Sequence, residues 1–217
     1  MANHTSRVEP VVVYGAGGLG REVLQLVRAA LCPRGARALG FVDDEVEPGT
    51  VLNGAEVLGG GEFLDTLREP FSVVYGFASP AAKKMIHARL KLNPLISFPS
   101  VVHPSASVSE YARIGEGVVI AASCIVSIDA VLGDCVFLNN GALIGHDSVL
   151  GSFVSVMPLA AISGNVAIGE CTLIGAQSAL IQGVNIGRNC VVGMGSVVLR
   201  DVPEGSTVLG NPAKRVS

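Results

Sequence analysis

The stretch IGEGVVIAASCIVSIDAVLGDCVFLNNGALIGHDSVLG (residues 114–151) carries an apolar residue at every sixth position. The same phase continues without insertion or slip through the second half of the chain. Its seventeen anchors are all Val, Ile or Leu: Val102, Val108, Ile114, Ile120, Val126, Leu132, Leu138, Ile144, Leu150, Val156, Ile162, Ile168, Ile174, Leu180, Ile186, Val192 and Val198. A short fixed period of this kind indicates a solenoid, in which each turn of the chain covers the next.

A second period of eighteen residues is superimposed on the first. Glycine follows every third anchor, at Gly115, Gly133, Gly151, Gly169 and Gly187. Three hexads therefore form one coil, and we expect glycine at one corner because it relieves the steric cost of the backbone conformation there. Residues four positions after the anchors are also small or apolar, so both sets should point inward. The pattern predicts stacked triangular coils of short parallel strands over 99–203, followed by a C-terminal tail over 204–217.

Composition and charge exclude several classes of protein. Hydrophobic residues make up 49% of the chain and charged residues 15%, and the formal net charge is −3. This charge gives no reason to expect nucleic acid or an anionic membrane as partner. No apolar run approaches the roughly eighteen residues of a membrane helix, and the first residues lack the layout of a signal peptide. We therefore expect a flexible segment over 1–9, a cytoplasmic location, no membrane insertion, and nearly uncharged coil faces that pair with other copies.

The first half of the chain has the pattern of a small Rossmann-like α/β domain over 10–98. VVVYGAGGLGREVLQLVR (11–28) predicts a buried strand, a glycine loop and an amphipathic helix, and the next strand ends in two carboxylates. Such a loop binds diphosphates by close backbone approach. We expect a nucleotide or nucleotide-sugar where five residues converge: Gly18, Gly20, Asp43, Asp44 and Gly76. The two aspartates could instead be a solvated strand end, since Asp favours turns.

The glycine loop, the hexapeptide coils, the GHD sequence at 145–147 and the GNPAKRV sequence at 210–216 together resemble one family. It is the PglD/NeuD-like family of nucleotide-sugar acetyltransferases. The resemblance implies that the parallel β-helix is left-handed and that the protein is a homotrimer. It also implies acetyl-CoA as cosubstrate, bound in the groove between neighbouring β-helices, and an acceptor sugar that attacks the thioester directly.

The resemblance also assigns site residues. The family's histidine base falls on His146, and the acidic neighbour that orients it falls on Asp147. Nucleotide contacts fall on Gly18, Leu19, Gly20, Asp43 and Asp44, and Leu19 stands where many members have histidine. Coenzyme contacts fall near Ala176 and Met194, and Pro212 and Lys214 lie where the nucleotide end of CoA usually rests. Ser155 occupies the position of a second histidine that contacts acetyl-CoA in some members.

The phase of the repeat supports a functional role for His146. Ile144 and Ser148 should point inward, so His146 should face outward, where Asp147 can hold the tautomer with a free basic nitrogen. A structural histidine is the alternative interpretation. We place His87 on the surface of a helix over 81–92. A zinc site on such coils needs three histidines, and only His103 and His146 lie there, so we expect no metal.

These observations predict an acetyl-CoA-dependent N-acetyltransferase that acts on a nucleotide-linked amino-deoxysugar in surface polysaccharide or glycan biosynthesis. Three alternatives stay open. The protein could acetylate a sugar hydroxyl, for instance on sialic acid. It could be a non-catalytic trimer that binds nucleotide-sugars. An NAD-dependent oxidoreductase is disfavoured, because the segment before the repeat has room for only one small α/β half.

Overall fold

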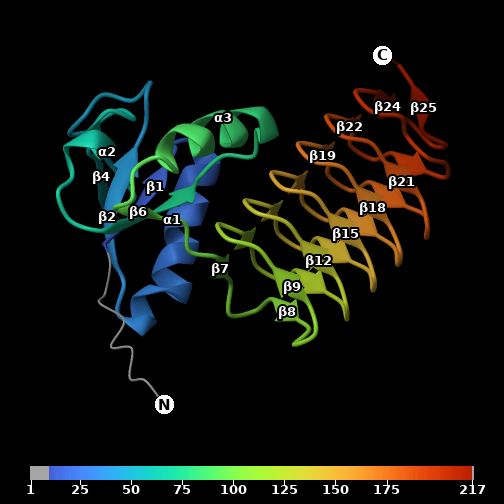
Figure 1. Ribbon diagram of the computed structural model, residues 1–217, viewed down its shortest axis with the longest axis horizontal. Coiled ribbons are helices and arrows are strands. Elements are labelled where there is room, and N and C mark those ends of the chain that lie inside the picture. Colours follow the sequence, from blue (N-terminus) through green and yellow to red (C-terminus); the bar gives the residue numbers. More distant parts are fainter. Residues whose placement is uncertain (1–9, 217) are drawn as a thin grey trace. The chain divides into compact units, whose positions relative to one another are not determined.

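The structure is a computed structural model that describes residues 10–216, so the segment 1–9 that we expected to be flexible lies outside the described residues (Figure 1). Contacts group the described chain into two compact units. The first comprises residues up to 77 together with 90–99, and the second comprises 78–89 together with 100–216. In the described part of the chain, no helix has the length and hydropathy needed to cross a membrane.

The first unit is built on one mostly parallel sheet with the strand order β3-β4-β2-β1-β5-β6. Its strands are β1 (Pro10–Tyr14), β2 (Arg37–Val42), β3 (Val51–Leu52), β4 (Ala55–Val57), β5 (Phe71–Tyr75) and β6 (Ile96–Ser97). Its helices are α1 (Gly18–Ala30), the 3-10 turn η1 (Cys32–Arg34) and the short α2 (Phe63–Thr66). The middle strand β1 is apolar and buried because neighbours pair with it on both edges and α1 packs its Val23, Leu24 and Val27 inward. Strand, glycine loop and helix follow one another as the sequence predicts.

The second unit is a solenoid of short strands, two residues long up to β23, whose three faces are three sheets that are parallel except for β25 (Figure 1). The β7 sheet contains β7 (Val101–Val102), β10 (Val119–Ile120), β13 (Phe137–Leu138), β16 (Ser155–Val156), β19 (Leu173–Ile174), β22 (Val191–Val192), β24 (Thr207–Leu209) and the antiparallel β25 (Lys214–Arg215). The β8 sheet contains β8 (Ser107–Val108), β11 (Ile125–Val126), β14 (Leu143–Ile144), β17 (Ala161–Ile162), β20 (Ala179–Leu180) and β23 (Val197–Val198). The β9 sheet contains β9 (Arg113–Ile114), β12 (Val131–Leu132), β15 (Val149–Leu150), β18 (Ala167–Ile168) and β21 (Asn185–Ile186). From β7 to β23, each strand pairs with the strand eighteen residues later, so the predicted coil length is confirmed there. The last step, from β22 to β24, is sixteen residues.

The anchors and the residues four positions after them fill the interior of the coils, as predicted. Ile120, Leu138, Ile144 and Val156 are fully buried, and their cluster extends from Val118 to Val208. The hydrophobic contribution is large, because each buried Val, Ile or Leu side chain contributes roughly 1.5–3 kcal/mol relative to an exposed one. The fold class is the predicted one, a Rossmann-like α/β domain followed by a left-handed parallel β-helix.

The corner glycines have a different reason from the one expected. None of the five has a positive φ, and the left-handed position falls two residues later, at residues such as Cys135 and Phe153. A Cβ on Gly133 would instead lie 2.7 Å from the backbone nitrogen of Ser152 in the next coil. Glycine is needed here because adjacent coils stack backbone against backbone, and not because of the backbone conformation.

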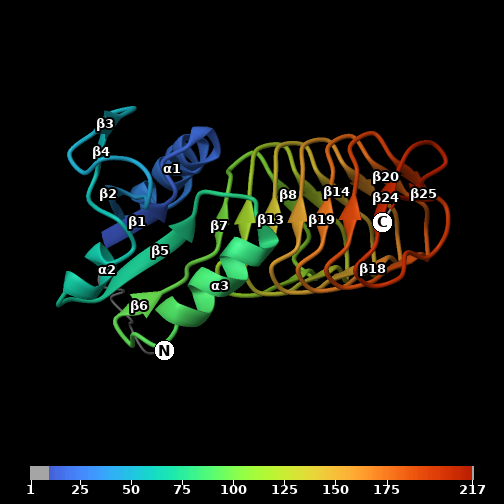
Figure 2. The same cartoon turned by 90° about the horizontal axis from the view of Figure 1, so that it is seen from above.

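Residues 80–89 of helix α3 (Pro80–Leu90) group with the coils, although sequence reasoning treated the helix as part of the first domain. Figure 2 shows one end of the helix beside β13. The Lys83 ammonium group is buried and donates hydrogen bonds to the carbonyl oxygens of Cys135 (2.8 Å) and Val154 (3.3 Å). The His87 ring contacts the Cys135 sulfur at 3.4 Å and stacks edge-on against Phe153. His87 is 5% exposed, so its expected surface position is wrong. His87 is buried by tertiary contacts with the coils, on a side of the helix that the helix sequence does not mark as apolar.

Candidate active site

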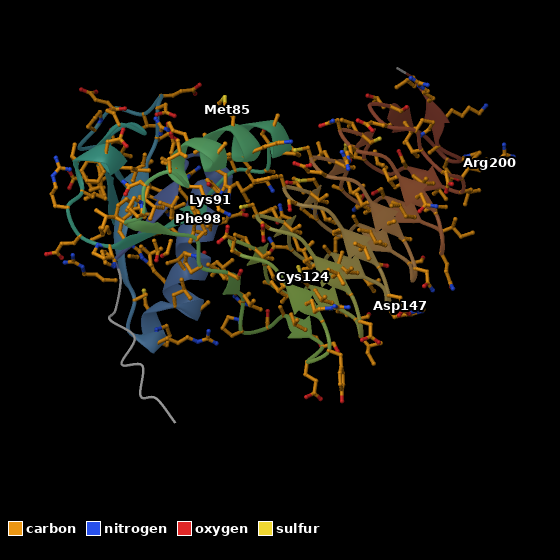
Figure 3. All side chains as sticks on the ribbon, in the orientation of Figure 1. Met85, Lys91, Phe98, Cys124, Asp147 and Arg200 are labelled. Carbon is orange, nitrogen blue, oxygen red and sulfur yellow. The ribbon has the colours of Figure 1, made fainter. Side chains whose placement is uncertain are left out.

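The GHD sequence forms the corner between β14 and β15. Ser148 ends this corner inside the coil, where its hydroxyl donates to the carbonyl oxygen of Ser163 and accepts from the backbone nitrogen of Val166. The side chains of His146 and Asp147 are half exposed and point away from the core, as the phase of the repeat predicts. Figure 3 shows Asp147 at the outer edge of the coils. The pair is therefore not part of the packing inside the coil.

The His146 ring is oriented by its neighbour. Its Nδ1 lies 2.7 Å from the Asp147 carboxylate oxygen Oδ2. An ionised carboxylate only accepts hydrogen bonds, so Nδ1 carries the proton and a neutral ring keeps an unprotonated Nε2. Asp147 also occupies a left-handed backbone position (φ 59°), which Asp and Asn tolerate better than most residues. The geometry provides a half-exposed imidazole with a defined tautomer.

The predicted coenzyme residues lie elsewhere on the solenoid. Ala176 and Met194 occupy equivalent places at a different corner, between the β7 and β8 sheets, and the Gly195 backbone nitrogen donates to the Ala176 carbonyl oxygen at 2.8 Å. Met194 is 70% exposed. Within one chain, the width of the β8 sheet separates this corner from His146. The structure brings Ala176 and Met194 together but does not bring them to His146.

Pro212 and Lys214 lie together at the C-terminal end of the coils. They line a cavity of about 410 Å³ whose wall also includes Arg200 and Arg215. Ser155, on β16, is fully buried, and its hydroxyl oxygen has no hydrogen-bond partner among the described residues. A coenzyme contact at Ser155 would require the atoms that cover it to move.

A larger concavity of about 790 Å³ runs along the β9 sheet and the corner that follows it. Glu170, Arg188 and Glu204 line it, together with outward residues of β15, β18 and β21. None of the predicted site residues borders it. A charged residue stands two positions after four of the five β9-sheet strands, at Glu116, Asp134, Glu170 and Arg188, and the repeat places these residues on one corner. Nothing in the sequence marks that corner as concave.

In the first unit, Gly15 and Gly20 of the glycine loop pack backbone to backbone with Gly76, which follows β5. A Cβ on Gly20 would overlap the carbonyl oxygen of Gly15, and a Cβ on Gly76 would lie 2.7 Å from the Gly20 Cα. Gly20 and Gly76 therefore converge as predicted, through close packing. Gly18 is exposed in the first turn of α1, and Leu19 beside it is half-buried.

Asp43 and Asp44 both hydrogen-bond within the protein. Asp43 accepts from the backbone nitrogens of Ala16 (2.6 Å), Glu45 (2.9 Å) and Val46 (3.0 Å). Burial alone would raise the pKa of Asp43, but these three donors hold it below its ordinary value. The Asp44 carboxylate accepts from the Tyr14 hydroxyl at 2.8 Å and from the backbone nitrogen of Gly61 at 2.7 Å. Both carboxylates hold the carboxyl ends of the strands and the glycine loop in place.

Within residues 10–216, no group of three or more His, Cys, Asp or Glu side chains is arranged to hold a metal ion. The five cysteines, all in the described residues, form no disulfide. Sequence reasoning missed the buried contacts of Lys83. The sequence indicates only that Lys83 lies on a helix. Nothing in the pattern of that helix predicts that this lysine is buried.

Two protein-family models match the chain. The PglD N-terminal domain matches residues 10–90, and the hexapeptide repeat of succinyl-transferase matches residues 165–200. No curated protein sequence matches it.

Several solved structures match nearly the whole chain. The acetyltransferase domain of PglB from Neisseria gonorrhoeae FA1090, in complex with acetyl coenzyme A, has a TM-score of 0.88 and 33% identity over 97% of this chain and 100% of that chain. PerB from Caulobacter crescentus, in complex with CoA and GDP-perosamine, has a TM-score of 0.87 and 31% identity over 97% of this chain and 99% of that chain. A perosamine N-acetyltransferase from the same organism, with a histidine replaced by Asn, matches with a TM-score of 0.87 and 29% identity over 97% of this chain and 98% of that chain.

The fold and these matches define an acyltransferase of the hexapeptide-repeat class. The chain belongs to the PglD/NeuD-like family of hexapeptide-repeat acetyltransferases.

Proposed function

We propose that the protein transfers an acetyl group from acetyl-CoA to the amino group of a nucleotide-linked amino-deoxysugar of the 4-amino-6-deoxy type. The reaction takes place in the cytoplasm and serves surface polysaccharide or glycan biosynthesis. The observation that carries the proposal is the outward His146–Asp147 pair, with 2.7 Å between Nδ1 and Oδ2. The acetyl-CoA bound to PglB and the GDP-perosamine bound to PerB support the two substrate classes.

His146 acts as the general base. The sugar amine attacks the thioester carbonyl carbon, and Nε2 of His146 takes the proton that the amine loses as the new C–N bond forms. The CoA thiolate leaves when the tetrahedral intermediate collapses, and the imidazolium returns the proton to it. Asp147 stabilises the imidazolium and holds the ring while this happens.

The first unit binds the nucleotide part of the acceptor. Gly18, Leu19 and Gly20 form the start of α1, which is exposed at Gly18 and has no acidic residue in its first turn, and this suits a diphosphate. Asp43 holds the loop through the Ala16 backbone nitrogen. Asp44 is exposed and retains lone pairs with which it accepts hydrogen bonds from a ligand hydroxyl.

The active protein is a homotrimer in which acetyl-CoA lies between the solenoids of two copies. Ala176 and Met194 bind the coenzyme at one corner of a solenoid, and Pro212 and Lys214 bind its nucleotide end. A neighbouring copy supplies the His146 corner that one chain alone keeps apart from these residues. The outward residues of the β8 sheet support this assembly, since they carry no charge and include the exposed Ile125 and Leu143.

The proposal is tested by the release of free CoA thiol from acetyl-CoA with a panel of acceptors. The panel contains UDP-, dTDP- and GDP-linked 4-amino-6-deoxysugars and free sialic acid. We expect turnover with an amino sugar and a fall of roughly 10²- to 10⁴-fold in kcat for His146→Ala, with the oligomer intact. Turnover with sialic acid alone would replace the proposal by O-acetylation. No turnover together with no binding of acetyl-CoA would leave only a binding protein.

The role of Asp147 has a matched control in the preceding coil. Asp129 occupies the equivalent left-handed position (φ 57°), but the residue before it is Ile128 and not a histidine. Asp147→Asn and Asp129→Asn both preserve the turn, because Asn tolerates this conformation. We expect a loss of at least about tenfold in kcat for Asp147→Asn only. Equal activity of the two variants would show that Asp147 serves the turn and not the histidine.

A further inference from the structure

One column of residues runs along the solenoid at the corner that carries His146. Residues eighteen apart lie one above another there, because Leu143 pairs with Ala161 and Ala161 with Ala179 in the flanking strands. The column contains Glu110, Ile128, His146, Gly164, Gln182 and Arg200. Gly164 is the residue of the next coil directly beside His146, and it is the one member of this set without a side chain.

The His146 ring occupies the space that a Gly164 side chain would need. A Cβ on Gly164 would lie 2.5 Å from Cε1, 2.5 Å from Nε2 and 3.0 Å from Cδ2 of His146. All three of these nearest atoms belong to the ring. Approaches below 3.0 Å force one group to move, and the half-exposed ring is the group that can.

Gly164 is not required by its own backbone. Its φ is not positive, and the left-handed residue of its corner is Asn165 (φ 55°). Nor does it resemble Gly145, where a Cβ would collide with the carbonyl carbon of Ser163 and the backbone nitrogen of Gly164 in the next coil. The three atoms nearest to a Cβ on Gly164 all belong to the His146 imidazole.

We propose that Gly164 is a positioning residue, whose missing side chain sets the direction in which Nε2 of His146 points. Asp147 holds Nδ1 of the ring, and the absence of a side chain at Gly164 leaves room for Cε1, Nε2 and Cδ2. A methyl group at position 164 turns the ring outward, breaks the Nδ1–Oδ2 hydrogen bond and displaces the basic nitrogen. This inference rests on the proposed function, in which His146 is the base.

The test compares Gly164→Ala with Ile128→Ala, which changes the neighbour on the other side of the same column. We expect Gly164→Ala to lower kcat by on the order of 10²-fold, as a displacement of about 1 Å does, while the Kd for acetyl-CoA changes less than about twofold. Ile128→Ala should change neither value appreciably. Circular dichroism melting verifies that both variants fold.

The decisive readout is the tautomer of His146, measured by ¹⁵N NMR of histidine-labelled protein and assigned with His146→Ala. The wild type and Ile128→Ala should show a protonated Nδ1, and Gly164→Ala should lose this preference. An unchanged tautomer overturns the inference even if kcat falls, because Gly164 would then act on the substrate and not on the ring. The NMR result stands without turnover, so failure of the proposed function is distinguishable from failure of the positioning role.

Discussion

Lys83 gives the sharpest stability prediction, because burial of its amine disfavours the charged form. Burial lowers the pKa of Lys83 from 10.5 to about 7, and nearby Cys135 and Cys171 oppose this shift only in part. Between pH 7 and 10.5 the unfolded chain holds a proton on this amine that the folded chain has released. The free energy of unfolding therefore rises with pH in this window, and the destabilisation is fully present below pH 7.

The magnitude follows from the size of the shift. One pKa unit corresponds to about 1.4 kcal/mol, so a depression from 10.5 to about 7 costs at most about 5 kcal/mol at low pH. From pH 7 to 8.5 the free energy of unfolding should rise by about 1.5 kcal/mol. Measurements should stop at pH 8.5, because burial raises the pKa of Cys124 and Cys171 above the ordinary thiol value of 9.0 and makes higher pH destabilising.

The assay is urea unfolding followed by circular dichroism at fixed protein concentration, at several values between pH 7 and 8.5. Lys83→Met keeps an apolar chain of similar length in the site and should abolish the rise. Lys84→Met is the matched control, since Lys84 is exposed and pairs with Glu170 at 2.7 Å, and it should retain the rise. A rise of equal size in Lys83→Met and the wild type would refute the assignment to this amine.

Three further predictions concern other residues. Asp43→Asn should lower the free energy of unfolding by about 1–2 kcal/mol, because an amide cannot accept all three backbone hydrogen bonds. The wild type should lose stability as the pH falls through the lowered pKa of Asp43, and this loss should be smaller in Asp43→Asn. Gly20→Ala should cost about 1–3 kcal/mol or more, since its Cβ would overlap the Gly15 carbonyl oxygen; an unchanged Tm would contradict this packing. Ser155→Ala should be neutral or stabilising by up to about 1 kcal/mol in urea unfolding, because it removes a buried hydroxyl without a partner among the described residues; a clear loss would reveal a partner.

The solenoid was predictable because its information is local and repeated. Each hexad places its own anchor, and seventeen repetitions in one phase leave a single register. The outward direction of His146 followed from that same register. The reason for the corner glycines was not predictable, since the close approach of Gly133 to Ser152 arises only between coils.

The position of α3 and the contacts of the two aspartates depend on tertiary structure. Lys83 and His87 lie on a helix whose sequence has no clear apolar side, so their burial against Cys135 could not be inferred. Asp43 and Asp44 were expected to bind a ligand, and their position after β2 is consistent with that. The sequence could not reveal that Ala16, Tyr14 and Gly61 already donate to them.

The route of the chain through α3 limits where this protein can be cut. The chain leaves the first unit after residue 77, contributes one helix to the solenoid unit, and returns to the first unit before it enters the coils at residue 100. A truncated protein that starts at residue 100 would lose the helix that supplies Lys83 and His87, and would leave the Cys135 carbonyl oxygen and the Phe153 ring without those contacts. A fragment that ends at residue 99 would carry a helix without its binding surface. No single crossover point between two related sequences would therefore separate the two units of this chain. A chimaera that preserves both units must take α3 and the coils from the same protein.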